Sequence, residues 1–229
     1  MAVILSGLIS MEFVGCVTAR LNSKRVPQKN IIKIGGKTLL TRAINTLNEV
    51  NQIKETYLYA SQKKIINYVD NSVKFKFLKR GKYLDGDYIT FKEVLTEFCK
   101  EISTDYIVLL HCTSPFIKSD TIKEMIKKIK TDDFDSAFAA TEIKNYCWYK
   151  NKPLNFDLDN LPRTQEIEPI IVETSSLYIF KKAYFQKTKR RTGKKPYIKK
   201  IGLFEGWDID WKEDVIMAEM IQSRINKIL

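Results

Sequence analysis

The chain has 229 residues and 44% hydrophobic content, which is enough for one sizeable core and makes a single main domain the expectation. The net charge of +12 points to nucleic acid, an anionic membrane surface or phosphorylated small molecules as partners, or else to a solvated basic surface. The four cysteines form no C-x-x-C pair and lack accompanying histidines, which argues against a zinc site or a secreted disulfide scaffold and favours a reducing, cytoplasmic location; they are Cys16, Cys99, Cys112 and Cys147.

The first eighteen residues are apolar only in places. Serine, glutamate and glycine interrupt them, and no basic segment precedes them, so residues 1–18 fit neither a signal peptide nor a membrane span. Met11 is a candidate working start. We therefore expect one domain over residues 11–229, with residues 1–10 as an extension.

The loop that follows the first expected strand, 13–18, is the most informative segment. It places Arg20, Lys24, Arg25 and Lys29 within ten residues, and these four charges repel one another unless solvent or a multiply charged anion lies among them. A proline stiffens the loop, so fewer conformations must be frozen on binding. This pattern predicts a site for a polyphosphate.

Strand-like and helix-like segments then alternate along the chain. Runs rich in β-branched and aromatic residues predict strands, and amphipathic spacing predicts helices between them, the last opening with Ser119 and Asp120 as candidate caps. This order predicts an α/β fold with a Rossmann-like, mostly parallel sheet, helices on both faces, and ligands at the carboxyl ends of the strands. The expected strands are 13–18, 55–60, 73–78, 106–110 and 136–141, and the expected helices 38–48, 62–70, 89–101 and 119–131.

The rhythm breaks after the fifth strand. Residues 142–173 contain aromatic side chains and three prolines but no long periodic run, and a strand follows at 176–180. We interpret residues 142–175 as an inserted arm. Exposed aromatic clusters mark an interface or a substrate lid, although a packed loop would show the same composition.

A run of lysines and arginines spans residues 181–200. A solvated face is the plainest interpretation. Nucleic-acid binding would require more interleaved aromatic residues than this run offers, and polybasic clusters also attract anionic lipid. We expect no nucleic-acid partner.

Two aspartates precede the last expected helix, 211–225. Asp208 and Asp210 lie on the same side of an extended segment, a spacing that lets two carboxylates share one hard cation. Asp210 also fits an N-cap role with Glu213 at the third helical position. Because Asp208 has no such second role, it is the stronger candidate for a metal ligand.

The cationic loop resembles the signature A-R-x-x-S-K-x-x-x-x-K-N of the cytidylyltransferases that make CMP-activated acidic sugars, namely the CMP-N-acylneuraminate synthetases and their CMP-3-deoxy-manno-octulosonate relatives. Further segments resemble this family in the same order, so the resemblance spans the chain from Phe13 onward. The matching positions are Ala19-Arg20, Ser23-Lys24, Lys29-Asn30, Arg80, Leu84, Asp87, the segment LLHCTSPF at 109–116, Ser136, Thr141-Glu142, Tyr178-Ile179-Phe180 and Asp208-Ile209-Asp210.

The chain departs from the family pattern on one side. Thr174-Ser175 stands where Asn-Gly is usual, His111 replaces a glutamine, and Ile117 replaces an arginine. The nucleotide side of the pattern is kept and the acceptor side is altered. The reaction type is therefore better supported than the acceptor.

The resemblance implies an enzyme that joins CMP from CTP to an acidic acceptor, a nonulosonic or related sugar, with release of pyrophosphate. In the family such products supply surface glycans such as capsule or lipopolysaccharide. The resemblance also implies Mg²⁺, held by Asp208 and Asp210, and a homodimer in which the arm reaches the partner's site. The alternatives are CMP transfer to a phosphorylated or phosphonylated small molecule, and a non-catalytic protein that binds nucleic acid or membrane.

For the nucleotide, the resemblance places Arg20 and Lys24 on the β- and γ-phosphates and Lys29 near the α-phosphate, with Ser23 and Asn30 bonding phosphate or orienting the loop. Arg80 would lie near the cytidine or its phosphates and Asp87 would shape the base pocket, unless the two form an ordinary surface ion pair. The expected CTP-binding residues are Ala19, Arg20, Ser23, Lys24, Lys29, Asn30, Arg80 and Asp87.

On the acceptor side, His111 is the only histidine and lies where a strand ends at the expected cleft. It is either an acceptor contact, acting as a base near neutral pH, or a positioning group. With Arg20 and Lys29 it forms the expected catalytic set. The expected acceptor contacts are His111, Thr113, Ser114, Arg163, Gln165, Glu173, Thr174 and Ser175.

Overall fold

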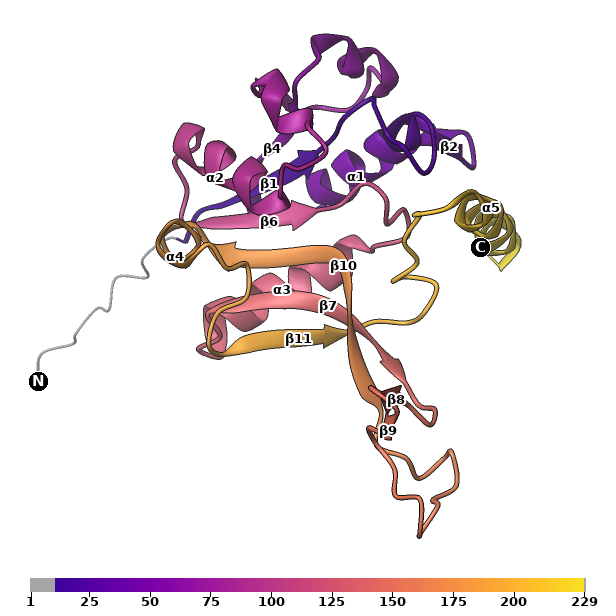
Figure 1. Ribbon diagram of the computed structural model, residues 1–229. Helices are drawn as coiled ribbons and strands as arrows, with labels where there is room; N and C mark the ends of the chain where they lie inside the picture. The colour runs from indigo at the N-terminus through magenta and orange to yellow at the C-terminus, as the bar shows by residue number, and fades with distance from the viewer. Residues whose placement is uncertain (1–10, 229) are drawn as a thin grey trace, which may run out of the picture.

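The computed structural model describes residues 11–228, so the extension expected at residues 1–10 lies outside the described residues. A seven-stranded sheet runs through the molecule in the order β11-β7-β10-β6-β1-β4-β5 (Figure 1). β10 is antiparallel to both of its neighbours and every other pair is parallel, which confirms the mostly parallel sheet. The strands are β1 Phe13–Thr18, β4 Ile53–Ala60, β5 Lys76–Lys79, β6 Tyr106–Leu110, β7 Ser136–Ile143, β10 Ile170–Lys181 and β11 Pro196–Lys200.

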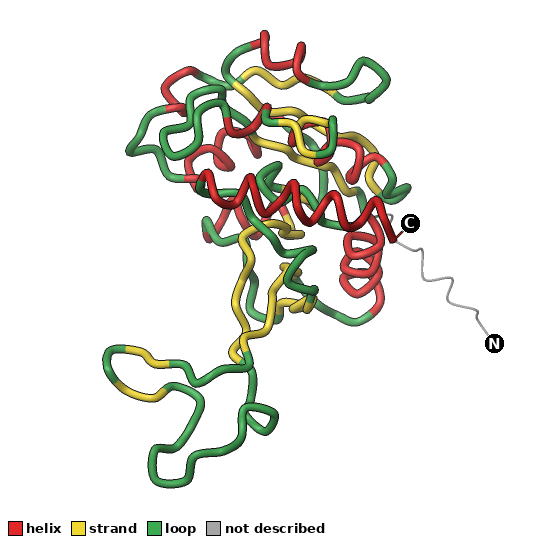
Figure 2. Tube along the Cα trace, turned by 90° about the vertical axis from the view of Figure 1, so that its right-hand side faces the viewer, coloured by secondary structure: helices red, strands yellow, loops and turns green. Residues whose placement is uncertain are grey.

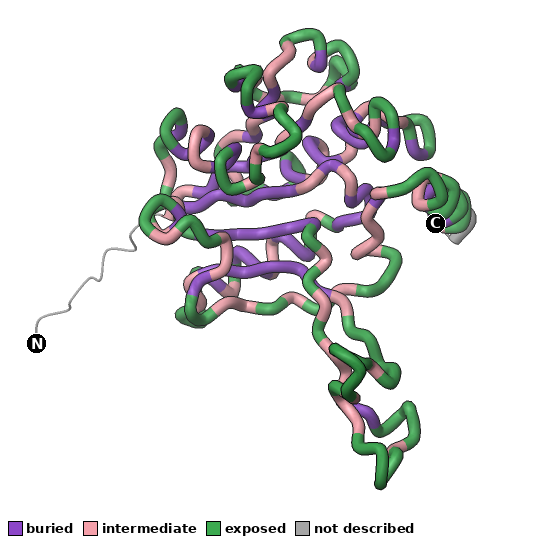
Figure 3. The backbone as a smooth tube through the Cα atoms, viewed as in Figure 1, coloured by how far each residue is buried: buried purple, intermediate pink, exposed green. Residues whose placement is uncertain are grey.

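Helices cover both faces of this sheet. Leu39–Asn48 (α1), Ser119–Thr131 (α3) and Lys212–Ile228 (α5) contribute to one apolar layer, and Phe91–Glu101 (α2) and Lys182–Thr188 (α4) to the other. Successive residues of β1 alternate between the two layers because side chains of a strand point to opposite faces. The central strands are accordingly buried along their length (Figure 3).

Short elements complete the body. Lys33–Ile34 (β2) and Lys37–Thr38 (β3) form a hairpin, and three 3₁₀ turns lie around the sheet edge. One of these turns replaces the helix expected at 62–70, so that prediction was wrong in type. The three turns are η1 Lys29–Ile31, η2 Lys63–Tyr68 and η3 Lys82–Asp85.

The cap predicted for α3 was also wrong. The residue before the helix is Lys118, which makes no side-chain cap bond, and Ser119 is already helical. Asp120 lies in the first turn and pairs with Lys123, with 2.8 Å between Oδ1 and Nζ. The carboxylate therefore sits favourably near the positive helix end without capping it.

The arm is an outgrowth of two central strands. β7 continues to Ile143 and β10 begins at Ile170, and these two residues pair with each other. Residues 170–175, which we expected within the arm, therefore belong to a strand. Residues 144–169 project from the body (Figures 1 and 2) and contain a small sheet of Trp148–Tyr149 (β8) and Lys152–Pro153 (β9).

β10 turns a corner where the arm meets the body. Glu173 pairs with Ala140 but Tyr178 pairs with Phe138, so extra residues bulge out of the ladder. Ser175 in this bulge has a φ of 57°, a left-handed conformation that favours glycine. Glycine would adopt this conformation without the steric cost that the serine side chain adds.

The basic run forms α4, a connecting loop and the edge strand β11, which we did not predict. Several of its lysines face carboxylates: Lys199 pairs with Glu124 at 2.5 Å and Lys200 with Glu142 at 2.6 Å. Within residues 11–228, no helix is both long and apolar enough to cross a membrane.

The N-terminus of α2 offers a test of local stability. Thr90 Oγ1 accepts from Glu93 N at 3.4 Å and Glu93 Oε2 accepts from Thr90 N at 2.7 Å, a reciprocal capping box. We expect Thr90→Ala to lower the free energy of unfolding by about 1 kcal/mol in urea denaturation. Thr96→Ala, the same change inside the helix, is the control and should be neutral or stabilising. Equal effects of the two changes would contradict the capping role.

Candidate functional site

A cavity of about 590 Å³ opens at the carboxyl ends of β1 and β6. The loop after β1, the segment after β6, the start of α2 and the segment before α5 meet there. Because carboxyl ends of parallel strands lie at one edge of a sheet, this position agrees with the ligand site expected from the sequence. Lining residues are Thr18, Ala19, Arg20, Ser23, Lys24, Arg25, Lys29, Asn30, Arg80, Leu84, Asp87, Ile89, Phe91, Val94, His111, Cys112, Thr113 and Asp210.

Asn30 fastens the cationic loop to the sheet. Its Nδ2 donates to the carbonyl of Arg20 at 2.8 Å, and its Oδ1 accepts from Cys112 Sγ at 3.3 Å. The amide is largely buried and both of these bonds are internal. This arrangement supports the loop-orienting alternative for Asn30 over direct phosphate contact.

The chain itself supplies carboxylates to the cations of the loop. Lys24 pairs with Asp87 at 2.7 Å, while Arg25 Nη2 and Lys29 Nζ both lie 2.9 Å from Asp210 Oδ1. Our expectation that only solvent or a bound anion relieves their repulsion was therefore incomplete. A polyanion that enters the cavity would replace these carboxylates as the partner of the cations. The Lys24–Asp87 ion pair is exposed, so separating it costs the least free energy.

Arg80 lies beneath this loop rather than at the surface. Its guanidinium is buried, lies 2.5 Å from Asp85 Oδ1 and packs 5.8 Å from the ring centre of Tyr59. Arg20 Nη1 donates to the carbonyl of the same Asp85 at 3.1 Å. The alternative of a surface pair between Arg80 and Asp87 was wrong. Asp85 was not singled out from the sequence. Its position five residues after Arg80, inside the segment that resembles the family, could have indicated it.

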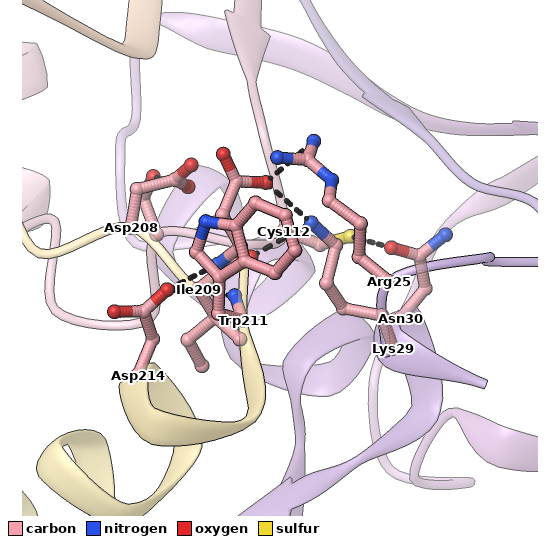
Figure 4. Close-up of polar contacts among 10 residues, drawn as sticks. Arg25, Lys29, Asn30, Cys112, Asp208, Ile209, Trp211 and Asp214 are labelled. Carbon is pink, nitrogen blue, oxygen red and sulfur yellow. Dashed lines mark hydrogen bonds and ion pairs between the residues drawn. The ribbon is translucent and has the colours of Figure 1, made fainter. Parts of the chain in front are cut away.

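The two metal candidates, Asp208 and Asp210, flank Ile209, which is buried. Figure 4 shows Asp208 and Ile209 in the same close-up as Arg25 and Lys29 of the loop. Ile209 N donates to the carbonyl of Thr113 at 2.9 Å, which fixes the segment beside the end of β6. Asp208 Oδ1 accepts from Ser114 Oγ at 2.9 Å, and the carbonyl of Ile209 accepts from Lys29 Nζ at 2.7 Å. Ser114 thus acts on Asp208 and does not line the cavity.

The cap predicted for α5 was wrong by one residue. Asp214, not Glu213, folds back, and its Oδ2 accepts from the backbone N–H groups of Asp210 and Trp211 at 2.8 and 2.7 Å. The Asp210 side chain is therefore not used as a cap and pairs with Arg25 and Lys29 instead. Burial opposes its ionisation, but the Lys29 hydrogen bond and the charges of Lys29 and Arg25 outweigh this and lower the pKa of Asp210.

The donor set around Asp208 and Asp210 fits Mg²⁺. The hydrogen bonds that Asp208 and Asp210 accept from Ser114 and Lys29 use Oδ1 of each carboxylate, and hard oxygen ligands are what this ion prefers. No group of three or more His, Cys, Asp or Glu side chains within the described range could hold a metal. A metal here would need further oxygens from a bound substrate.

His111 is held at the end of β6, against the wall of the cavity. Its backbone N–H donates to the carbonyl of Ser176 at 2.8 Å and its ring lies 4.8 Å from that of Phe91. Burial, and then the charges of Arg191 and Lys29, lower the pKa of His111 to about 4. The ring is therefore neutral at pH 7, so a base titrating near neutral pH is disfavoured and a hydrogen-bonding role is favoured.

The other expected acceptor residues divide into two groups. Tyr178 connects Glu173 with His111. Its O–H donates to Glu173 Oε1, and its ring centre is 6.4 Å from that of His111. Burial and the Glu173 bond raise the pKa of Tyr178 to about 12, even though Ser175 bonds to it as well. Thr113 lines the cavity directly.

The remaining expected contacts do not reach this cavity. Thr174 Oγ1 donates to the carbonyl of Ala139 at 3.0 Å and serves the corner of β10. Arg163 lies on the projecting arm, with its side chain 81% exposed and paired with Glu166. Gln165 is on the same exposed arm, so neither contacts the cavity of its own chain.

Comparison with known proteins gives a family and several relatives. A family model described as cytidylyltransferase matches residues 14–216. The chain is 24% identical over 207 residues to N-acylneuraminate cytidylyltransferase A of Danio rerio, covering 85% of this chain and 48% of that protein. It is 28% identical over 134 residues to pseudaminic acid cytidylyltransferase of Campylobacter jejuni, covering 56% of this chain and 57% of that protein. The chain thus spans about half the length of these relatives.

A solved structure shows the same fold. CMP:2-keto-3-deoxy-manno-octonic acid synthetase, complexed with CTP, superposes with a TM-score of 0.70 at 13% identity, covering 95% of this chain and 100% of the other. At this identity the likeness concerns the fold alone. The Rossmann-like architecture expected from the sequence is confirmed.

The single histidine permits a clean test of its charge state. The folded protein keeps His111 neutral down to about pH 4, whereas the unfolded chain takes up a proton near pH 6.5. The unfolded state therefore gains protons first as pH falls, and stability is lost between pH 6.5 and 4. Relative to His111→Asn, the wild type should lose about 2 kcal/mol of unfolding free energy on going from pH 8 to pH 5. Parallel pH profiles for the two proteins would contradict a buried neutral ring.

Proposed function

Because the chain belongs to the cytidylyltransferase family, we propose that it transfers CMP from CTP to an acidic sugar and releases pyrophosphate. One observation carries the proposal. Four cations of one loop line a cavity at the carboxyl ends of the strands, and Asp210, which lines the same cavity, forms ion pairs with two of them. The names of the relatives, which include sialic and pseudaminic acid cytidylyltransferases, support an acidic nonulosonic acceptor.

The loop residues would hold the triphosphate. Arg20 and Lys24 are placed for the outer phosphates because both line the cavity and neither is locked by a buried carboxylate partner. Lys29 is 12% exposed and fixed by Ile209 and Asp210, so it is preorganised beside the reacting phosphate. Charge fixed in this way needs no reorganisation as negative charge grows on the leaving pyrophosphate.

In the proposed reaction an acceptor hydroxyl oxygen attacks the α-phosphorus of CTP. The new bond joins that oxygen to phosphorus, the bond from the α-phosphorus to the bridging oxygen breaks, and pyrophosphate leaves with the bonding pair. The hydroxyl proton passes to solvent or to a nearby base. Neutral His111 orients the acceptor oxygen in this scheme, since its low pKa makes it a weak base.

Asp208 and Asp210 would hold Mg²⁺ together with phosphate oxygens of CTP, and the ion would neutralise charge on the triphosphate. Ser114 keeps Asp208 turned toward this place through its 2.9 Å bond. Lys29 and Arg25 keep Asp210 ionised before the nucleotide arrives.

The exposed arm supports a homodimer. Its surface carries large apolar side chains, among them Trp148 at 56% and Leu158 at 60% exposure, which a partner would cover. In such a dimer Arg163 and Gln165 would reach the acceptor side of the other copy. The free cysteines, three of them buried, suit the reducing cytoplasm, and the activated sugar would serve surface glycan synthesis.

The direct test measures pyrophosphate release with CTP, Mg²⁺ and a panel that includes N-acetylneuraminate, pseudaminic acid and 3-deoxy-manno-octulosonate. We expect release with at least one acid and preference for CTP over the other nucleoside triphosphates. Lys29→Ala should lower kcat/KM by about 100-fold because it removes a fixed donor at the reacting phosphate. Lys33→Ala, an exposed lysine on β2, is the control and should stay within twofold. Silence across the panel, together with no CTP binding in calorimetry, would refute the proposal.

The metal assignment has its own test. Asp208→Asn should raise the Mg²⁺ concentration needed for half-maximal activity and lower kcat by at least about 100-fold, because a neutral amide binds a hard cation weakly. Asp210→Asn should do the same, since it removes the second carboxylate of the pair. Asp120→Asn on exposed α3 is the control. An unchanged Mg²⁺ dependence in Asp208→Asn would overturn its role as a ligand.

A further inference from the structure

One cation of the basic run turns inward. Arg191 lies on the loop between α4 and β11, and its guanidinium carbon is 3.9 Å from the ring centre of Tyr178 and 5.6 Å from that of Phe91. The side chain is half-buried, unlike its exposed neighbour Arg190. Two aromatic rings therefore hold this guanidinium in one place.

The stacked guanidinium has no carboxylate partner among residues 11–228. Glu173 accepts a hydrogen bond from the Tyr178 O–H, and it forms no ion pair with Arg191. Stacking uses the faces of a guanidinium and leaves its N–H donors in the plane of the group. An oxyanion can therefore bind to two of these donors side by side.

A second unsatisfied group lies beside it. His111 Nε2 is buried and has no hydrogen-bond partner in the described part of the chain, a state that costs free energy unless a ligand completes it. The His111 ring packs on Phe91 and Tyr178, the same two rings that hold Arg191. His111 and Phe91 also line the cavity described above. Because Arg191 stacks on Phe91, its guanidinium lies next to the wall of that cavity.

We propose that Arg191 binds the carboxylate of the acidic acceptor and that His111 Nε2 bonds to a hydroxyl of the same molecule. This assignment rests on the proposed function and deepens it. The anion is assigned to the acceptor rather than to CTP because the four cations of the loop after β1 already provide for the triphosphate. Arg191 is then a specificity-determining residue that selects acids over neutral sugars.

The experiment compares Arg191→Gln with Arg190→Gln, an exposed arginine one residue away on the same loop. With the acid that the wild type uses best, Arg191→Gln should raise the acceptor KM by 10- to 100-fold and leave the KM for CTP within twofold. Arg191→Lys should recover part of the loss, since it keeps the charge but not the two-donor geometry. Arg190→Gln should match the wild type. Thermal melting shows whether each variant is folded.

The methyl ester of the same acid provides the second arm. The wild type should prefer the free acid to the ester by at least tenfold, and Arg191→Gln should treat the two nearly alike. An unchanged acceptor KM in folded Arg191→Gln, or an equal rise in both KM values, would overturn the assignment; the equal rise would place the anion on CTP.

Calorimetry with N-acetylneuraminate, pseudaminic acid and 3-deoxy-manno-octulosonate, with and without CTP, separates this proposal from the proposed function. Acid binding by the wild type that is lost in Arg191→Gln and kept in Arg190→Gln supports the site even without turnover. No acid binding by the wild type overturns it. Failure of the proposed function has a different readout, because the wild type would then release no pyrophosphate with any acceptor.

Discussion

The site depends on the pairing of two cations of one loop with a single carboxylate. Lys29 and Arg25 both lie 2.9 Å from Asp210 Oδ1, across more than 180 positions of sequence, and Lys29 also holds the carbonyl of Ile209. Without this pairing the charges of Lys29 and Arg25 would lie close together without a counter-charge, and they would repel each other. Ile209 makes the pairing possible, since its burial and its bond to Thr113 bring the C-terminal segment to the edge of β6. The loop, the end of β6 and the segment before α5 thus form one electrostatic unit.

The nucleotide side and the acceptor side of the cavity are built differently. On the nucleotide side, polar groups are paired with one another and held in place: Asn30 bridges to Cys112, and Asp85 holds the buried Arg80. On the acceptor side, His111 Nε2 lacks a partner among the residues that the structure describes, and Arg191 stacks on the rings of Tyr178 and Phe91. Where the polar side chains already have partners in the protein, a ligand must replace those partners. Where a side chain has no partner, the ligand supplies a hydrogen bond that the free protein lacks. This contrast agrees with a family sequence pattern that is kept on one side and altered on the other.

Strand prediction succeeded where burial left no ambiguity. β1 and β6 have the bounds expected, because continuous apolar runs in a central parallel position admit one arrangement. β11 was missed because this edge strand begins with a proline and ends in two lysines, which is the composition of a solvated loop. The first half of β10 was assigned to the arm because its exposure alternates, and only pairing with the extended β7 makes it a strand. The helix expected at 62–70 became a 3₁₀ turn, since Ile65 is buried but Tyr68 is exposed, so the turn lacks a full apolar stripe.

The sequence by itself determined the alternation of strands and helices, the cationic loop after β1 and the aspartate pair before α5, because these are local patterns with a physical meaning at fixed spacing. The tertiary structure decided the partners. Asp210 meets Lys29, Arg80 meets Asp85 instead of Asp87, and Arg191 meets Tyr178 and Phe91, and none of these encounters is encoded in local spacing. Charge and burial act through space, so the neutral state of His111 and the roles of its neighbours follow only once the chain is folded.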